Sequence, residues 1–97
     1  MRTILIDPFR KEVRETDLEA NLWSLQAAVG GDIEFAVRID KHDFLYVADR
    51  VWCTERFVVG GTRSFAGFGV VVGVTGDGAT APAKVALDAL RRVVRFP

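Results

Sequence analysis

Residues 22–34 constrain the fold most, because they predict a short helix that changes directly into a strand. Apolar side chains recur at helical spacing and define the buried face of this helix: Leu18, Leu22, Leu25 and Val29. Thr16 and Glu19 have the spacing of a capping box, which predicts Thr16 as the N-cap. Gly30-Gly31 predicts the end of the helix, since glycine adopts the left-handed conformation without a steric penalty.

Alternation of polar and apolar residues predicts strands around this helix. The predicted elements, in chain order, are a hairpin (residues 2–6 and 12–15), the helix, a second hairpin (33–39 and 44–47), a short strand (57–59), an apolar strand (68–75) and a last helix (82–94). The 97 residues form a single domain, residues 1–97. The predicted fold is therefore α+β: a small mixed or antiparallel sheet of about five strands (hairpin, helix, meander), with the C-terminal helix packed on it.

The second hairpin is followed by an irregular segment. Within strand 33–39, strict alternation assigns four apolar side chains to one face: Ile33, Phe35, Val37 and Ile39. Residues 40–43 form a polar connection, and residues 49–55 show neither a helical nor a strand period. Pro82 is expected in the first turn of the last helix, where proline is tolerated.

The stretch 68–75 is the most apolar of the predicted strands, which indicates a central position covered on both faces. Gly67, Gly69 and Gly73 open and interrupt it. A dinucleotide-binding loop needs the spacing G-x-G-x-x-G between a strand and a helix, and both conditions are missing here. Glycine within a strand more often marks a bulge or the close approach of another backbone segment, so we predict no cofactor.

Charge is distributed unevenly along a chain whose formal net charge is zero. Neutrality argues against a dedicated nucleic-acid-binding domain, which usually carries a positive excess. Residues 1–55 carry a net charge of −4 and residues 56–97 one of +4. The bases of the last helix lie near its C-terminus, where the helix dipole favours them. The uneven charge could also support head-to-tail self-association or binding to a charged partner, and both interpretations stay open.

Few side chains are suited to catalysis or metal binding. His42 is the only histidine and Cys53 the only cysteine, so a closed zinc site of four nitrogen or sulfur ligands is not available within one chain. We interpret His42 as an exposed turn residue and Cys53 as a small buried one. No enzymatic activity and no metal is predicted. The lone cysteine and the absence of a long apolar run favour a cytoplasmic protein without a membrane span.

Tryptophan and arginine are the residues most enriched at binding hot spots. Trp52 lies between Arg50 and Arg56 in the irregular segment, and Arg63 follows it, so these four residues form the candidate partner-binding site. Trp23 lies at the edge of the apolar face of the first helix, which favours core packing at least as much as a contact surface. The alternative candidate is an anion-binding cluster: Arg91, Arg92 and Arg95.

Three segments occur in a fixed order: Ile4-Leu5-Ile6-Asp7-Pro8, the helix-to-strand residues 22–34 and the glycine-rich residues 67–73. Together they resemble a family of small proteins in phage and plasmid genomes that is known only as a domain of unknown function. The resemblance covers most of residues 1–78 and implies a small α+β protein of a mobile element, without an assigned activity. Residues 50–64 and the last helix depart from the pattern.

These observations favour a non-enzymatic phage or mobile-element accessory protein that binds an unidentified host or phage protein. Inhibition of a host defence nuclease is one concrete form of this hypothesis. The alternative is a small-ligand or nucleic-acid binding module that uses the C-terminal arginines. Edge strands of a small sheet pair readily across a two-fold axis, so a homodimer is compatible with this fold.

Overall fold

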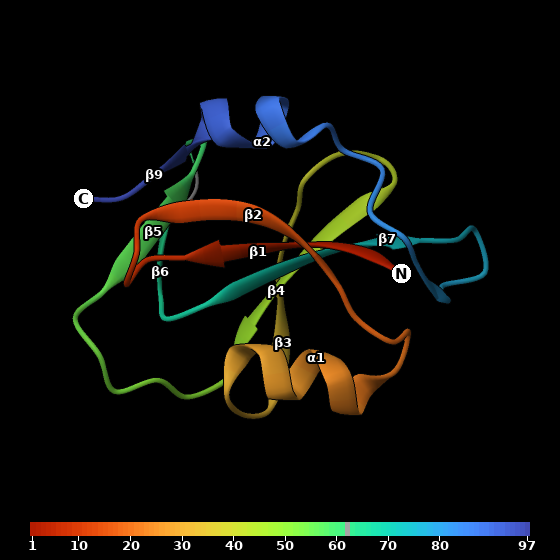
Figure 1. The fold of residues 1–97 in the computed structure, drawn as a ribbon, viewed down its shortest axis with the longest axis horizontal. Helices are drawn as coiled ribbons and strands as arrows, with labels where there is room; N and C mark the ends of the chain where they lie inside the picture. The colour runs from red at the N-terminus through yellow and green to blue at the C-terminus, as the bar shows by residue number, and fades with distance from the viewer. Residues whose placement is uncertain (62) are drawn as a thin grey trace.

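The computed structural model describes residues 1–61 and 63–97 and shows the predicted α+β fold, with antiparallel sheets and a C-terminal helix (Figure 1). The described elements, in chain order, are β1 (Arg2–Asp7), β2 (Glu12–Asp17), α1 (Leu22–Val29), β3 (Ile33–Arg38), β4 (Asp43–Ala48), β5 (Arg56–Val59), β6 (Ser64–Ala66), β7 (Gly69–Val74), β8 (Thr80–Ala81), α2 (Leu87–Val93) and β9 (Val94–Arg95). Among the described residues, no helix has the length and apolar character needed to cross a membrane.

The main sheet is antiparallel, with the strand order β2-β1-β7-β4-β3. Strand β8 belongs to the same sheet and also pairs with β7. Strand β7 is central and residues 70–72 are fully buried, as the apolar sequence predicts. Two glycines of β7 leave room for a neighbouring group. A Cβ at Gly69 would lie 2.6 Å from the ring of Phe57, and one at Gly73 would lie 2.2 Å from the carbonyl oxygen of Pro82. The predicted close approach of another backbone segment is confirmed at Gly73, whereas Gly69 is approached by the Phe57 side chain.

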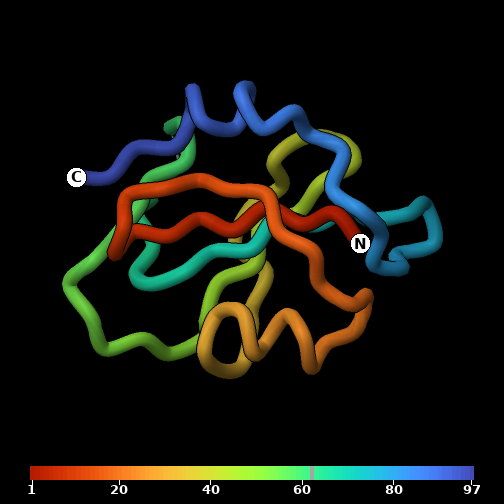
Figure 2. Tube along the Cα trace, viewed as in Figure 1, coloured from red at the N-terminus to blue at the C-terminus, as the bar shows by residue number. Residues whose placement is uncertain are grey.

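A smaller sheet, in the order β6-β5-β9, packs with α2 against one face of the main sheet. The core between them is built from both sheets, α2 and the segment before it: Ile4, Ile6, Val13, Leu45, Val47, Phe57, Val59, Phe65, Val71, Ala83, Leu90 and Val94. Helix α1 covers the opposite face, where Leu25 and Val29 pack with Ala48, Val70 and Val72. The trace in Figure 2 shows the two helices on opposite sides of the main sheet.

The start of α1 differs from the prediction. Strand β2 continues through Thr16 to Asp17, so Thr16 is not an N-cap and the predicted capping box is wrong. The helix begins after Asn21, whose side-chain oxygen accepts the backbone N–H of Ser24 at 2.8 Å. The end of the helix confirms the prediction, because Gly30 is the C-cap with a φ of 86°.

The last helix is shorter than predicted, because α2 begins at Leu87 and not near Pro82. Residues 82–86 have no regular secondary structure, and Ala83 is buried in the core. The backbone N–H groups of residues 83–85 and the carbonyl oxygens of Ala83 and Val85 bond to residues of the main sheet and are therefore not available for a helix.

The bonds that hold this segment come from Asp43 and Arg2. Asp43 is fully buried at the start of β4, and its carboxylate accepts the backbone N–H groups of Lys84 at 3.0 Å and of Val85 at 2.6 Å. The Arg2 guanidinium donates to the carbonyl oxygens of Ala83 and Val85, both at 2.9 Å. The prediction of Asp43 in a polar connection is therefore wrong: its side chain fixes the approach to α2.

Strand β3 does not alternate as predicted. The register with β4 shifts between Phe35 and Val37, which makes Ala36 the extra residue of a β-bulge. Val37 and Ile39 consequently pack against the core under the smaller sheet, whereas Phe35 lies on the opposite face beside aromatic residues of β4. The prediction that Phe35 shares a face with Val37 and Ile39 is wrong.

Candidate functional site

Trp52 extends into solvent from a segment whose base is fixed. Residues 49–55 are irregular, as predicted, and the Trp52 side chain is 98% exposed. Val51 next to it packs with the core under α1, and a Cβ at Gly67 would lie only 3.0 Å from its Cγ1. The backbone N–H of Gly67 also donates to the carbonyl oxygen of Glu55 at 3.0 Å. The segment therefore holds the indole away from the core and in contact with water.

Two of the predicted arginines meet in a hollow that Val51 also lines. The hollow has a volume of about 350 Å³ and lies between the ends of β3 and β4 and the β5–β6 hairpin: Glu34, Val47, Ala48, Asp49, Val51, Arg56, Arg63, Ser64, Phe65 and Ala66 line it. Arg56 donates from Nε to Ser64 Oγ at 2.9 Å, and the Arg63 guanidinium lies 5.2 Å from the ring centroid of Phe65. Trp52 does not line this hollow, although its chain neighbour Val51 does. We call Trp52, Val51, Arg56 and Arg63 the Trp52 surface. Arg50 is exposed in the same segment and does not line the hollow.

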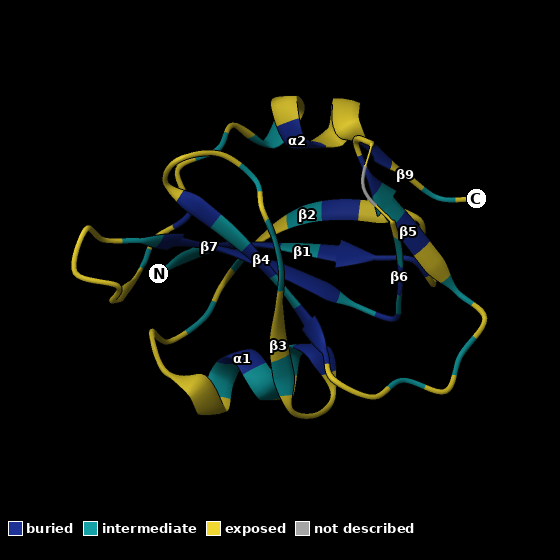
Figure 3. Cartoon of the chain, turned by 180° about the vertical axis from the view of Figure 1, so that it is seen from behind, coloured by how far each residue is buried: buried dark blue, intermediate teal, exposed yellow. Residues whose placement is uncertain are grey.

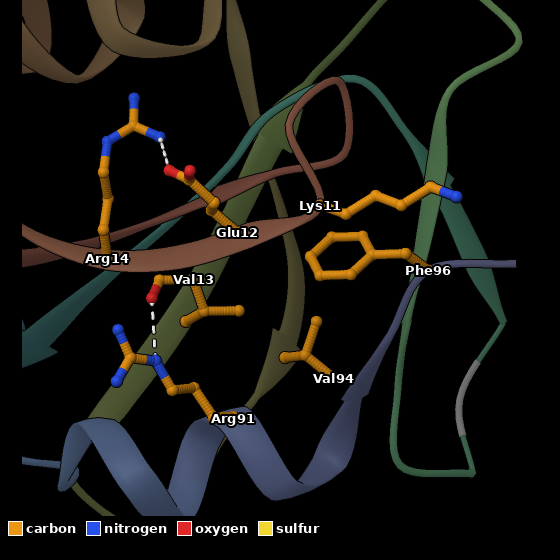
Figure 4. Close-up of a pocket in the computed structure, with 7 residues that line it drawn as sticks. All are labelled: Lys11, Glu12, Val13, Arg14, Arg91, Val94 and Phe96. Atoms are coloured by element: carbon orange, nitrogen blue, oxygen red, sulfur yellow. Dashed lines mark hydrogen bonds and ion pairs between the residues drawn. The ribbon is translucent and has the colours of Figure 1, made fainter.

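The alternative cluster is divided by the fold. Arg91 lines a hollow of about 340 Å³ between β2, α2 and β9, together with Lys11 and Arg14 (Figure 4). Arg95 lines a different hollow with Val58 and the C-terminal residues, and Arg92 lines neither. The predicted set Arg91, Arg92 and Arg95 therefore does not form one site, although Arg91 gains two basic neighbours from the acidic half of the sequence.

The cations of the Arg91 hollow are tied to the surrounding structure. Arg91 donates from Nε to the carbonyl oxygen of Val13 at 3.0 Å, and Arg14 contacts the carboxylates of Asp7 at 3.0 Å and Glu12 at 3.4 Å. Figure 4 shows the guanidinium groups of Arg14 and Arg91 on different sides of β2. The floor of the hollow is apolar, with Val13, Val94 and Phe96 lining it. The arrangement provides positive charge around an apolar notch, without convergence of the cations on one point.

Asp7 connects this region to the first hairpin. Its buried carboxylate accepts the backbone N–H groups of Phe9 at 3.0 Å and Arg10 at 3.1 Å, in addition to the Arg14 guanidinium. Burial alone would raise the pKa of Asp7, but the hydrogen bonds from Arg14, Arg10 and Phe9 together outweigh it and hold this pKa below its ordinary value. Asp7 is therefore a charged, structural group at neutral pH.

The remaining candidate groups lie apart. His42 is exposed in the turn between β3 and β4, and Cys53 is half-buried with its Sγ 3.5 Å from the carbonyl oxygen of Glu55. Across residues 1–61 and 63–97, no three His, Cys, Asp or Glu side chains are grouped so that they could hold a metal ion. Trp23 is 81% exposed on α1, so core packing, one of the two interpretations of this residue, is wrong. Leu22 is 58% exposed, so its prediction on the buried face of the helix is wrong as well, because only Leu25 and Val29 of α1 are buried.

Comparison with known protein families, curated proteins and solved structures finds no match. The resemblance to the phage and plasmid family stays a prediction, and the site is interpreted from its own geometry.

Sequence reasoning missed a group of aromatic side chains on the outer face of β3 and β4. Phe35, Phe44 and Tyr46 contact one another there, and the Arg38 guanidinium lies 5.3 Å from the ring centroid of Phe44. The alternation of Phe44 and Tyr46 along β4 is a readable signal that both share a face. The bulge at Ala36 adds Arg38 to that face, and strict alternation does not reveal it.

Proposed function

We propose that this chain is a non-enzymatic accessory protein of a phage or other mobile element, which binds a protein partner through the Trp52 surface in the cytoplasm of the host cell. The observation that carries the proposal is the nearly complete exposure of Trp52 on a segment anchored by Val51. A tryptophan side chain buries roughly 150–250 Å² in a contact, and at about 25 cal/mol per Å² its burial by a partner stabilises a complex by several kcal/mol.

The two arginines of the hollow that Val51 lines strengthen this interpretation. Arg56 is held by the Ser64 hydroxyl and Arg63 lies over the Phe65 ring, so both guanidinium groups are oriented before a partner arrives. Binding then costs less side-chain entropy than it would with freely rotating arginines. An exposed aromatic anchor beside oriented arginines is the composition typical of a binding hot spot.

The origin and the process are part of the same proposal. The three segments that resemble the phage and plasmid family support a mobile-element origin. Inhibition of a host defence nuclease is the concrete form we favour for the process. The separation of His42, in the turn after β3, from Cys53, in the turn after β4, supports a role in binding over one in nucleophilic catalysis.

Affinity capture from lysate of the native host, with tagged protein and mass spectrometry, tests the proposal. We expect Trp52→Ala to weaken retention of a stoichiometric partner by about 30-fold or more, which corresponds to about 2 kcal/mol. Arg63→Ala should weaken it as well. Trp23→Ala is the matched control, because it removes the other exposed tryptophan from a different surface. Undiminished capture by both Trp52→Ala and Arg63→Ala, with folding verified by circular dichroism, would contradict the proposal.

A second candidate function is the binding of a small anionic ligand in the Arg91 hollow. The observation that favours it is that Lys11, Arg14 and Arg91 line one hollow with an apolar floor, although their charged groups do not converge on one point. Calorimetric titration with pyrophosphate at low salt tests it, with Arg91→Ala compared with Arg92→Ala, since Arg92 lies outside the hollow. Absence of binding to the unsubstituted protein would remove this candidate.

A further inference from the structure

We propose that the outer face of β3 and β4 binds single-stranded nucleic acid by stacking bases on Phe35 and Arg38. The aromatic face is defined here as Phe35, Arg38, Phe44 and Tyr46. This is a second binding surface, separate from the Trp52 surface and from the Arg91 hollow.

The aromatic face is built as a supported platform. The ring centroids of Phe35 and Phe44 lie 5.0 Å apart, and that of Tyr46 lies 6.2 Å from Phe35 and 6.4 Å from Phe44. Phe35 stands opposite Tyr46 and Arg38 opposite Phe44 across the two strands. The β-bulge at Ala36 produces this arrangement, because without the extra residue Phe35 and Arg38 would point to opposite faces.

Helix α1 leaves Phe35 largely uncovered. The buried residues of α1, Leu25 and Val29, pack with Ala48, Val70 and Val72, and Tyr46 packs against this cluster. Val70 and Val72 stand opposite Tyr46 and Phe44 on the neighbouring strand β4. Phe35 is 52% exposed, and Phe44 and Tyr46 are half-buried beneath and beside it. Figure 3 shows exposed residues within β3. The rings are therefore accessible from solvent at a fixed position on two paired strands.

Charged residues at the turn of the β3–β4 hairpin indicate which kind of ligand the aromatic face binds. Arg38, Lys41 and His42 are exposed there, in and directly before the turn that joins β3 to β4. The carboxylate of Asp40 is directed to the backbone N–H groups of His42 and Asp43, at 2.8 Å and 2.9 Å. The Asp43 carboxylate is buried against Lys84 and Val85 on the other face, so the acids next to the turn do not cover its cations.

Unpaired bases and a phosphate backbone match this combination of groups. Single-stranded nucleic acids bind on platforms where bases stack on aromatic rings or arginine planes while nearby cations contact phosphates. A base on Phe35 and a base on the solvent side of Arg38, above Phe44, would place the neighbouring phosphates near the charged groups of Arg38 and Lys41. A duplex keeps its bases stacked internally and cannot use the platform. A second copy paired along β3 is disfavoured, because a bulge disrupts edge-strand pairing.

Fluorescence anisotropy with a labelled oligothymidine, and with a duplex of the same length, tests this inference at low salt. We expect tighter binding to the single strand, and a plot of log affinity against log salt with a slope of about −1.4, because the two charged side chains at this end of the hairpin, Arg38 and Lys41, would neutralise two phosphates. Phe35→Ala and Phe35→Leu should each weaken binding by about tenfold, because leucine keeps the apolar volume but has no π-face. Phe9→Ala, which removes an equally exposed ring from the β1–β2 turn, should bind as the unsubstituted protein does.

Arg38 provides the sharper comparison. Arg38→Lys keeps the charge and removes the planar group, so affinity should fall while the salt slope is retained. Arg38→Ala should also reduce the slope by about 0.7. Equal affinity for the duplex, no binding at low salt, or unchanged binding by both Phe35 variants would overturn the inference. Trp52→Ala leaves this surface intact, so partner capture and oligonucleotide binding fail independently.

Discussion

Replacement of Asp43 by alanine should be among the most destabilising polar substitutions in this chain. The carboxylate is fully buried and accepts two backbone N–H groups, from Lys84 and Val85, at distances between 2.6 and 3.0 Å. Hydrogen bonds to a charged group contribute about 1.5–3 kcal/mol each, so the two donors set an upper range of about 3–6 kcal/mol. Alanine also removes the cost of burying a carboxylate, which offsets part of the loss. We therefore expect the free energy of unfolding to fall by about 2–4 kcal/mol.

Two further variants make this expectation specific. Asp43→Asn keeps one acceptor oxygen and should lose about half as much as alanine. Asp40→Ala is the matched control, because Asp40 also accepts two backbone N–H groups but is exposed, and its loss should be only about 1 kcal/mol.

The assay is urea denaturation followed by far-UV circular dichroism, since Trp23 and Trp52 are already exposed in the folded protein and report unfolding poorly. A loss below about 1 kcal/mol for Asp43→Ala, with an unchanged m-value, would refute the reasoning.

Two other structural predictions concern strands β7 and β1. Gly73→Ala should cost at least about 2–3 kcal/mol in chemical denaturation, because its Cβ would lie 2.2 Å from the Pro82 carbonyl oxygen, whereas Gly76→Ala, with open space around it, should stay within about 0.5 kcal/mol. Asp7 has a lowered pKa in the folded state, so its contribution to stability is present at neutral pH and is lost as the pH falls below about 4. Asp7→Asn should therefore flatten the fall in stability between neutral and acidic pH, and an unchanged acid dependence would contradict this assignment.

Local signals explain what the sequence predicts correctly. The left-handed conformation at Gly30 depends on that residue alone, and the central position of β7 follows from a strand whose both faces are apolar. The exposure of Trp52 is also consistent with a local signal, since residues 49–55 have no period that would bury one face.

The errors arise where distant groups decide the local conformation. Pro82 begins a segment whose residue types could start a helix. The backbone of that segment is instead bound by Asp43, more than forty residues away along the chain, and by Arg2, about eighty residues away. Thr16 fits a capping box, but its place in the ladder of β2 with β1 prevails. No periodicity in the sequence reveals these competing partners, because they are supplied by tertiary structure.

The bulge at Ala36 is the clearest example, and it also connects fold to function. Strand β4 alternates regularly, with Leu45 and Val47 in the core under the smaller sheet and Phe44 and Tyr46 on the outer face. Phe35 stands opposite Tyr46 in the register that begins at Ile33 and Ala48, and a regular strand from there would turn Val37 and Ile39 to the outer face as well. The extra residue instead returns Val37 and Ile39 to the core, so the bulge contributes to stability. It also turns Arg38 to the face that carries Phe35, Phe44 and Tyr46, and this second effect is the one that the proposed binding uses.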